Sequence, residues 1–392
     1  MNRTLPRIIP LRAAAPIGRA QPIPLSLYVH WPWCVRKCPY CDFNSHASAP
    51  QEAAYLAALI ADLDAALPDI WGRPIVSVFI GGGTPSLMAG ATVEALLSAL
   101  RARLRLLPDA EITLEANPGA ADAERFRAYA DAGVTRLSLG VQSFADRQLA
   151  LLGRIHSGKE AFSAIELAQR HFRRVNLDLM LALPEQTLAA ARRDIATAIA
   201  TGVTHISAYQ LTLEPNTPFH HAPPPLPDED LAADMLEMAE AELLAAGFEH
   251  YETSAFAKPG ERCRHNLNYW TFGDYLGIGA GAHSKISSPA GIRREARARH
   301  PQAYLADPVT RRWQAVAARD LPGEFMMNAL RLLDGVPLSL FSERTGCDFA
   351  TIEKSALAAR QQGLLEIADG RMRPTPLGRR FLNRLIALFL AE

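Results

Sequence analysis

The feature that most constrains the fold of this chain is a sixfold alternation between short, β-branched apolar runs and longer segments with helical spacing. The predicted strands are Ser26–His30, Ile75–Ile80, Glu111–Ala116, Arg136–Val141, Val175–Leu181 and His205–Leu211. The predicted helices that follow them cover 51–67, 91–107, 121–132, 158–171, 187–201 and 228–247. A strand followed by a helix, repeated in this way, requires parallel strands that are joined by right-handed crossovers.

This pattern predicts an α/β fold. Most of the strands are nearly continuous apolar runs, as expected when both faces of a sheet are covered. Six strand–helix units are fewer than the eight of a closed barrel, so the periodicity leaves two architectures open. One is a partial (βα)6 barrel, and the other is a doubly wound sheet. Asp122 and Thr187 can cap helix starts, and Gly133 falls where a helix should stop.

The regions outside this core, which we expect to span residues 26–255, have other patterns. Residues 1–25 carry four arginines, five prolines and no acidic residue, which predicts a flexible arm. After about residue 255 the rhythm changes, and 256–322 predict a linking region. Residues 323–392 predict a winged-helix-like domain with helices at 323–334, 338–345, 349–362 and 377–390 and a hairpin at 363–375, near whose turn Gly370 lies.

The composition restricts the possible partners. Lys+Arg and Asp+Glu are equal at 41 each, which argues against a protein whose whole surface binds nucleic acid or anionic lipid. No apolar run approaches the ~20 residues of a membrane span. Five cysteines are too few for a disulfide scaffold, and three of them lie within eight residues. This clustering favours a metal site in a reducing compartment, and we expect a cytoplasmic protein.

The clustered cysteines Cys34, Cys38 and Cys41 form a C-x3-C-x2-C pattern directly after the first predicted strand. Thiolates in such a loop bind an iron–sulfur cluster or zinc. Three protein ligands on a four-iron cluster leave one iron open to a small molecule, as in catalytic metal sites with a vacant position. The alternative is a zinc site completed by His30 or His46, and the spacing alone leaves both open.

Polar residues also gather at the ends of the predicted strands. Glu115, Gln142 and Gln210 stand at the ends of the third, fourth and sixth strands, and Asp178 lies within the fifth. The second strand ends in the glycine turn Gly81–Gly83, whose backbone N–H groups can approach a ligand closely. If the strands form a barrel, these residues share the end that carries function in (βα) barrels.

The cysteine segment, Tyr28-Val-His-Trp-Pro-Trp-Cys34-Val-Arg-Lys-Cys38-Pro-Tyr-Cys41-Asp-Phe, resembles the signature of the radical S-adenosylmethionine (SAM) superfamily. The resemblance implies a [4Fe–4S] cluster on Cys34, Cys38 and Cys41, with SAM on the open iron. It also implies a partial (βα)6, TIM-like barrel. In such proteins the cofactor carries the chemistry and the protein orients it.

Further strings narrow the resemblance: Gly-Gly-Gly-Thr-Pro-Ser after the second strand, Glu-Ala-Asn-Pro at Glu115, Gly-Val-Gln-Ser-Phe at Gln142 and Asn-Leu-Asp-Leu at Asp178. They are similar to the subfamily that contains oxygen-independent coproporphyrinogen III dehydrogenase and the HemW-type heme chaperones. By this resemblance, the residues that contact SAM are Tyr28, Tyr40, Gly82, Gly83, Thr84 and Glu115. The residues that match a second SAM site of the dehydrogenase are Gln142, Arg154, Asp178 and Gln210.

Two features favour the chaperones within this subfamily. The dehydrogenase pattern has a fourth cysteine where this chain has Phe43, and it has a longer N-terminal segment. The string from His265 to Trp270 matches the His-Asn-x-x-Tyr-Trp motif of HemW-type proteins, which implies that His265 holds heme. A neutral imidazole is a good axial ligand of heme iron. Cys263 is a rival ligand, because its two arginine neighbours would favour the thiolate.

The expected function is heme delivery to an acceptor protein that the sequence does not identify, with an electron donor as a further partner if SAM is cleaved. We expect no nucleic-acid partner, because acidic residues interrupt the basic residues of the C-terminal domain. Two alternatives remain. One is oxygen-independent oxidative decarboxylation of coproporphyrinogen III, and the other is a zinc-stabilised nucleic-acid-binding protein.

Overall fold

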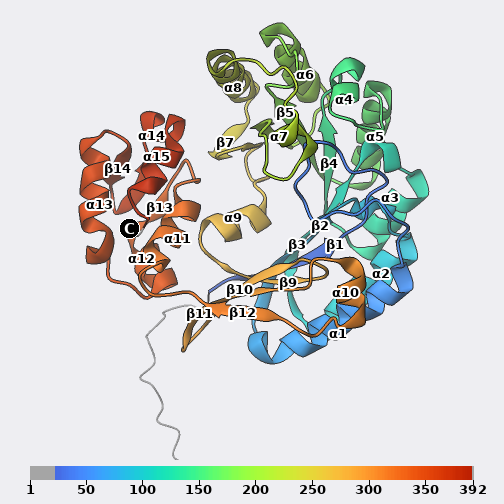
Figure 1. Cartoon of the computed structure of the whole chain (residues 1–392), viewed down its shortest axis with the longest axis horizontal. Coiled ribbons are helices and arrows are strands. Elements are labelled where there is room, and N and C mark those ends of the chain that lie inside the picture. Colours follow the sequence, from blue (N-terminus) through green and yellow to red (C-terminus); the bar gives the residue numbers. More distant parts are fainter. Residues whose placement is uncertain (1–22, 391–392) are drawn as a thin grey trace, which may run out of the picture.

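The computed structural model describes residues 23–390 (Figure 1). The arm expected at residues 1–25 therefore lies almost entirely outside the described residues. The six predicted strands all form, and each keeps its place in the chain. They are β1 (Leu25–Trp31), β2 (Pro74–Gly82), β3 (Arg105–Ala116), β4 (Arg136–Gln142), β5 (Arg174–Leu181) and β6 (His205–Gln210).

These six strands are parallel, and they lie side by side in chain order. Sequential order decides between the two open architectures, because a doubly wound sheet reverses its strand order at a switch point and a barrel does not. The prediction of a partial barrel is confirmed. Figure 1 shows the helices around its outside. They are α1 (Glu52–Ile70), α2 (Gly90–Arg103), α3 (Ala123–Ala132), α4 (Asp146–Leu151), α5 (Gly158–His171), α6 (Leu188–Ala200) and α8 (Glu229–Ala245). The short helix α7 (Pro218–His221) instead contacts the loop after β1, where the Phe219 N–H donates to the Pro39 carbonyl oxygen at 3.1 Å.

The helix ends agree with the capping signals in the sequence. The side chain of Asp122 accepts a hydrogen bond from the backbone N–H of Arg125, and that of Thr187 accepts one from Ala190. Gly133 ends α3 with a φ of 101°, a left-handed conformation that favours glycine. The predictions of these helix starts and of this stop are confirmed.

Within the barrel, the predicted boundary between the second helix and the third strand is wrong. The second helix was expected to run to residue 107, but α2 ends at Arg103 and β3 begins at Arg105. The reason is strand pairing, because Arg105 and Leu106 lie opposite Pro74 and Ile75 of β2. Pairing with β2 therefore outweighs the helix propensity of these residues, which is a local property and does not include contacts with distant strands.

Residues 256–322, expected to link two domains, carry more of the same sheet. The elements from the end of the core onward are β7 (Glu249–Glu252), β8 (Ala255–Ala257), α9 (Arg264–Trp270), β9 (Asp274–Ile278), β10 (His283–Ser288), β11 (Gly291–Ala296), α10 (Pro301–Ala306) and β12 (Arg312–Ala315). Strand β9 pairs in parallel with β1, and β8 pairs antiparallel with β6. The barrel is extended at both edges, giving the order β12-β11-β10-β9-β1-β2-β3-β4-β5-β6-β8-β7.

The C-terminal part has the expected winged-helix-like pattern of helices and a small hairpin, on the left in Figure 1. The turn of the hairpin contains Gly370, whose φ is 70°. The last expected helix, 377–390, is instead broken at Phe381 into two short helices. The elements are α11 (Leu321–Ala329), β13 (Val336–Pro337), α12 (Leu338–Thr345), α13 (Ala350–Gln361), β14 (Leu365–Ala368), β15 (Arg371–Pro374), α14 (Pro376–Arg380) and α15 (Leu382–Ala387).

The inside of the barrel is polar, whereas the apolar side chains of the strands pack in one large core. Side chains on neighbouring strands hydrogen-bond to one another across this interior. Ser26 and Ser77 are joined by 2.7 Å between their hydroxyl oxygens, and the amide of Asn176 donates to the Ser138 hydroxyl at 2.7 Å. A polar interior with buried charged groups suits a polar ligand at its open end.

Candidate functional site

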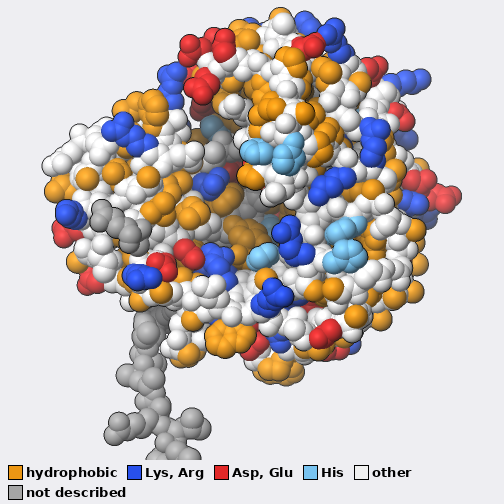
Figure 2. Space-filling model, in the orientation of Figure 1, with side chains coloured by type: hydrophobic (Ala, Val, Ile, Leu, Met, Phe, Trp, Pro, Cys, Tyr) orange, Lys and Arg blue, Asp and Glu red, His pale blue; other side chains and the backbone are white. Residues whose placement is uncertain are grey.

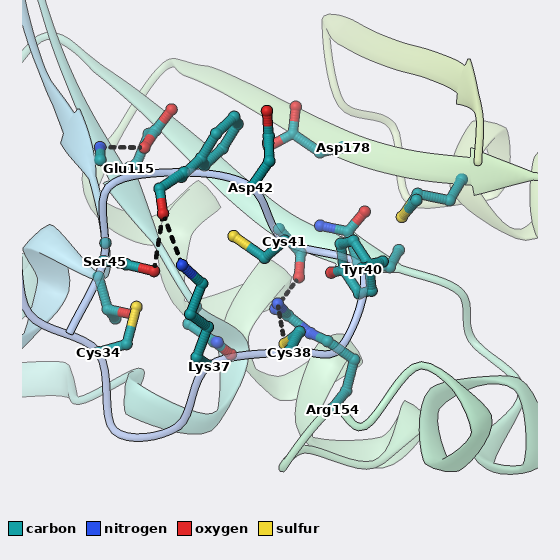
Figure 3. Close-up of a pocket in the computed structure, with 18 of the residues that line it drawn as sticks. Cys34, Lys37, Cys38, Tyr40, Cys41, Asp42, Ser45, Glu115, Arg154 and Asp178 are labelled. Carbon is teal, nitrogen blue, oxygen red and sulfur yellow. Dashed lines mark hydrogen bonds between the residues drawn. The ribbon is translucent and has the colours of Figure 1, made fainter. Parts of the chain in front are cut away.

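A cavity of about 500 Å³ opens at the carboxyl ends of β2 to β6, beside the loop that follows β1. Its lining brings together every predicted site residue except Tyr28 and His265. Figure 3 shows the labelled cysteines around one part of it, with Glu115 and Asp178 nearby. The predicted residues in the lining are Cys34, Cys38, Tyr40, Cys41, Gly82, Gly83, Thr84, Glu115, Gln142, Arg154, Asp178 and Gln210.

The three cysteines lie on the loop between β1 and α1, and all three are free thiols of intermediate exposure. The base of this loop is closed where the backbone N–H of Cys34 donates to the His46 carbonyl oxygen at 3.0 Å. Further along, the N–H of Cys41 donates to the carbonyl oxygen of Cys38 at 3.1 Å, which turns the chain back on itself. The loop thereby holds three sulfur atoms at one cavity.

Neighbouring side chains donate hydrogen bonds to two of these sulfur atoms. The Thr84 hydroxyl donates to Cys34 Sγ at 3.4 Å, and Arg154 Nη1 donates to Cys38 Sγ at 3.8 Å. Hydrogen bonds of this kind stabilise thiolates and tune an iron–sulfur cluster. Three thiols around one open cavity, two of which accept hydrogen bonds from polar donors, fit a cluster that keeps one iron free of protein ligands.

The positions of the two histidines that a zinc site would need, His30 and His46, argue against the zinc alternative. Both ring nitrogens of His30 are engaged, because Nε2 donates to the Asn44 carbonyl oxygen at 2.8 Å and Nδ1 accepts from the Tyr28 hydroxyl at 2.9 Å. The ring of His46 packs against His300, with 5.3 Å between the ring centroids. Neither histidine lines the cavity. Among residues 23–390, no three His, Cys, Asp or Glu side chains are grouped to hold a single metal ion.

The glycine turn after β2 is packed against the base of the cysteine loop. A side chain at Gly82, whose φ is 116°, would come within 2.6 Å of the His30 ring. A side chain at Gly83 would come within 2.5 Å of the Trp33 carbonyl oxygen. The two glycines are therefore required for close contact between two loops, in addition to any contact with a ligand.

Two half-buried carboxyl groups face the cavity from β3 and β5. Glu115 accepts a hydrogen bond from the backbone N–H of Gly82 at 3.0 Å, and Asp178 accepts from Ser138 at 3.2 Å and Asn176 at 2.8 Å. Burial, together with the nearby charge of Asp178, raises the pKa of Glu115 to about 8. Burial also raises the pKa of Asp178. A cationic ligand beside this pair would favour the ionised carboxylates.

Glu115 should make the stability of the protein depend on pH. Its pKa of about 8 in the folded protein exceeds the ordinary value of 4.5, so between these values the folded chain holds a proton that the unfolded chain has lost. The free energy of unfolding should therefore fall as pH rises from about 5 to about 8, by up to about 1.4 kcal/mol per pH unit. Glu115→Gln should remove this contribution. Urea unfolding of the metal-free proteins measures it, and a pH-independent difference between variant and wild type would contradict it.

The far side of the cavity is built by β4, β6 and the turn before α5. Gln142 has a φ of 67°, which is uncommon for a residue with a side chain, and its Oε1 accepts from the Tyr209 hydroxyl at 3.0 Å. Arg154 donates from Nη2 to the Gly140 carbonyl oxygen at 2.6 Å. These contacts hold the guanidinium between β4 and the cysteine loop.

Several lining residues were not predicted from the sequence. Ser138 lies four residues before Gln142 on β4, and Tyr209 lies two residues before Leu211, the predicted end of the sixth strand; every second residue of a strand points to the same side. Counting by two from the strand ends could have found them. Asn117 and Glu214 lie in loops after β3 and β6, where no periodic signal exists.

The two remaining predicted residues lie away from the cavity lining, inside the barrel. The Tyr28 ring stacks on Phe79 with 6.3 Å between centroids, and Phe79 stacks on His265 with 4.8 Å between centroids. His265 lies on α9 and is 3% exposed. Its Nδ1 is hydrogen-bonded to the Ser77 hydroxyl at 3.0 Å. Burial lowers the pKa of His265 to about 3, so the imidazole is neutral.

The rival ligand Cys263 has different chemistry from that expected. We expected its arginine neighbours to favour a thiolate, and this expectation is wrong. The thiol is 1% exposed and donates to the carboxylate of Glu111 at 3.4 Å. Burial raises the pKa of Cys263 to about 12, which keeps it a neutral thiol.

Figure 2 shows the face of the molecule that is hollowed between the C-terminal domain and the barrel, with Lys, Arg and His side chains around the hollow. Elsewhere on the surface, Val35 and Phe43 of the cysteine loop are each 58% exposed. The described part of the chain contains no helix with the length and apolar character that a membrane crossing requires.

Comparison with known proteins identifies both parts of the chain. The radical SAM superfamily model matches residues 28–197, and the HemN C-terminal domain model matches residues 316–381. The structure of coproporphyrinogen III oxidase (HemN) from Escherichia coli has a TM-score of 0.80 over 96% of this chain and 92% of that chain. At 23% identity, this likeness supports the fold.

Curated relatives are much more similar in sequence. "Heme chaperone HemW" of Escherichia coli (strain K12) is 49% identical over 374 residues, which cover 94% of this chain and 99% of that protein. The protein of the same name from Haemophilus influenzae is 47% identical over 94% of this chain and 98% of its own length. The chain therefore belongs to the radical SAM superfamily and, within it, to the HemW-type proteins.

Proposed function

We propose that this protein binds heme and delivers it to an acceptor protein, and that it holds a [4Fe–4S] cluster and SAM at the open end of its barrel. The observation that carries this proposal is the His-Asn-x-x-Tyr-Trp string on α9, in a chain that aligns over 94% of its length with a protein named heme chaperone. Heme is the cargo here, and the cluster with SAM is the resident cofactor.

Cys34, Cys38 and Cys41 would hold the cluster, because they are the free thiols at the cavity. When bound, the cluster and SAM supply one-electron chemistry at the sulfonium. Thr84 and Arg154 donate hydrogen bonds to the sulfur atoms that would bind the iron.

The other lining residues would orient SAM. The carboxyl groups of Glu115 and Asp178 would face its positive charges, and Gly82 and Gly83 would keep its approach free of side chains. Tyr28 does not line the cavity. It would affect the SAM site only indirectly, through His30, which accepts a hydrogen bond from the Tyr28 hydroxyl. The remaining proposed lining residues are Tyr40, Gln142 and Gln210.

The two alternatives have less support. Phe43 stands where the dehydrogenase pattern has its fourth cysteine, and its ring cannot replace a thiol. A nucleic-acid-binding role would need a free basic face on the wing, but Arg373 of β15 is paired with Glu366 of β14 at 2.8 Å. The side chain of Arg371 is bonded to the backbone carbonyl oxygens of Asp334 and Gly335.

The proposal is tested by giving the anaerobically reconstituted protein two substrates in parallel. Heme-loaded protein should transfer heme to an apo-heme protein such as apomyoglobin, followed by the absorption spectrum of the acceptor. With coproporphyrinogen III and SAM, no decarboxylated porphyrinogen should form. Formation of that product at a catalytic rate, without heme transfer, would overturn the proposal.

A further inference from the structure

Helix α9 lies between the barrel and the C-terminal domain, and it presents different side chains to each. His265 and Asn268 are buried, while Leu267 and Trp270 pack against the apolar core of the C-terminal domain. This core is formed around Phe325 and Phe341. The helix that carries the heme motif is thus held from two sides.

On the barrel side, Glu111 of β3 fixes the start of the helix. Its Oε1 accepts hydrogen bonds from the backbone N–H groups of Arg264 at 3.1 Å and His265 at 3.3 Å. Its Oε2 accepts from Arg174 at 2.7 Å. The His265 ring lies between two other rings, stacked on Phe79 and edge-on to that of Tyr269, 5.0 Å away.

On the other side, the C-terminal domain grips both ends of α9. Arg262, just before the helix, forms an ion pair with Asp334 at 2.7 Å. Near the end of the helix, the Arg331 guanidinium lies over the Trp270 ring, 5.0 Å from its centroid. We call this set of contacts, formed by Asp334 and Arg331, the α9 clamp.

This arrangement disagrees with heme ligation by His265 as it stands. An axial ligand needs an open face beside its nitrogen that is wide enough for a porphyrin plane. His265 is 3% exposed and has aromatic rings at 4.8 Å and 5.0 Å. Close-packed rings leave no space for a macrocycle.

We propose that α9 is a removable plug of the barrel: heme reaches His265 only after α9 leaves this position, and the α9 clamp sets how often it does so. The inference rests on the proposed function, because it assumes that His265 is the heme ligand. A protein whose binding-competent state is rarely populated shows an apparent affinity reduced by that population. Contacts that hold α9 in place therefore slow heme uptake, and an acceptor that loosens them would change heme retention.

The experiment compares two double variants of the full chain. Arg331→Gln with Asp334→Ala removes the α9 clamp. Arg373→Gln with Glu366→Ala is the matched control. It removes an exposed Arg–carboxylate pair from the same domain, but this pair lies on the wing hairpin formed by β14 and β15. Neither double variant removes a residue of the cavity or the heme ligand.

Two quantities are measured: deuterium uptake by the α9 amides without heme, and the rate of heme association. An exposed ion pair and a cation–π contact each stabilise the docked position of α9 only modestly. The clamp variant should therefore increase both the deuterium uptake and the rate of heme association about three- to tenfold. The control should match the wild type. Unchanged α9 exchange and unchanged heme association in the clamp variant would overturn the plug.

The His265→Phe variant distinguishes an error in the heme-ligand assignment from an error in the plug. If His265→Phe binds heme like the wild type, the ligand assignment is wrong. If His265→Phe loses heme but the clamp variant behaves like the wild type in both measurements, only the plug is wrong.

Discussion

Replacing any one of Cys34, Cys38 and Cys41 by alanine should abolish retention of the iron–sulfur cluster by the anaerobically reconstituted protein. A four-iron cluster with one iron left for SAM has three protein ligands, and all three come from one loop. With one thiol removed, two ligands hold a cluster in a cavity of about 500 Å³ that is open to solvent. Iron and sulfide content and the visible absorption of the purified variants measure the loss.

Cys347→Ala is the matched control for this prediction. Cys347 is also a free cysteine of intermediate exposure, but it lies after α12 in the C-terminal domain and does not line the cavity. The control should retain the full cluster. Equal loss in Cys347→Ala, or full retention in Cys38→Ala, would contradict the assignment of the three thiols.

Thr84→Val adds a finer test of the same site. The Thr84 hydroxyl donates to Cys34 Sγ at 3.4 Å, and valine keeps the shape of the side chain without the donor. This variant should keep its cluster but show a lower reduction potential, because a hydrogen bond to a cluster sulfur stabilises the reduced state. Electrochemistry or redox titration measures it, and a potential equal to that of the wild type would contradict it.

The core of the fold could be predicted because its signals are local and repeated. The six strands are short apolar runs, and some of the helices between them start at a side-chain cap, such as Asp122 and Thr187. Parallel strands joined by helices then admit few topologies. The choice between barrel and open sheet needed the observed strand order, since periodicity is the same in both.

The region around 256–322 could not be predicted from the same signals, because its elements are short. Helix α9 has seven residues and β8 has three, which is too little for a period to be recognised. These elements are stabilised by partners distant in the chain, such as Glu111 for the start of α9. That is also why the sequence could identify His265 as a motif residue but could not reveal its burial under Phe79.

At the cavity, the motif residues were predicted more completely than their neighbours. Residues such as Glu115 and Gln142 stand out because polar groups at strand ends interrupt apolar runs. The role of Gly82 and Gly83 in seating the cysteine loop depends on close packing between segments about 50 residues apart, where an added side chain would come within 2.5–2.6 Å of its neighbours. Only the folded chain reveals this packing.

Replacing His265 by phenylalanine should abolish ligand-specific heme binding while leaving the fold intact. Phenylalanine keeps a ring between Phe79 and Tyr269, and the Ser77 hydroxyl keeps its other partner, Ser26, at 2.7 Å. The variant lacks the imidazole nitrogen that would bind the iron. Loss of an outer-shell partner alone lowers the affinity of a metal site by roughly 10- to 100-fold, so heme affinity should fall by at least this factor. Heme titration followed by absorption spectroscopy measures the affinity and the ligand signature.

His265→Ala separates the packing role of the ring from its ligand role. It removes the same nitrogen but also empties a buried site, so it should lower the free energy of unfolding by about 2–4 kcal/mol, whereas His265→Phe should not. Added imidazole should restore heme binding to the alanine variant, because a small ligand can occupy the space, and should not restore it to the phenylalanine variant. Cys263→Ser should bind heme like the wild type, since the Cys263 thiol is neutral and bonded to Glu111. Loss of heme binding in Cys263→Ser, with wild-type binding in His265→Phe, would transfer the ligand role to Cys263.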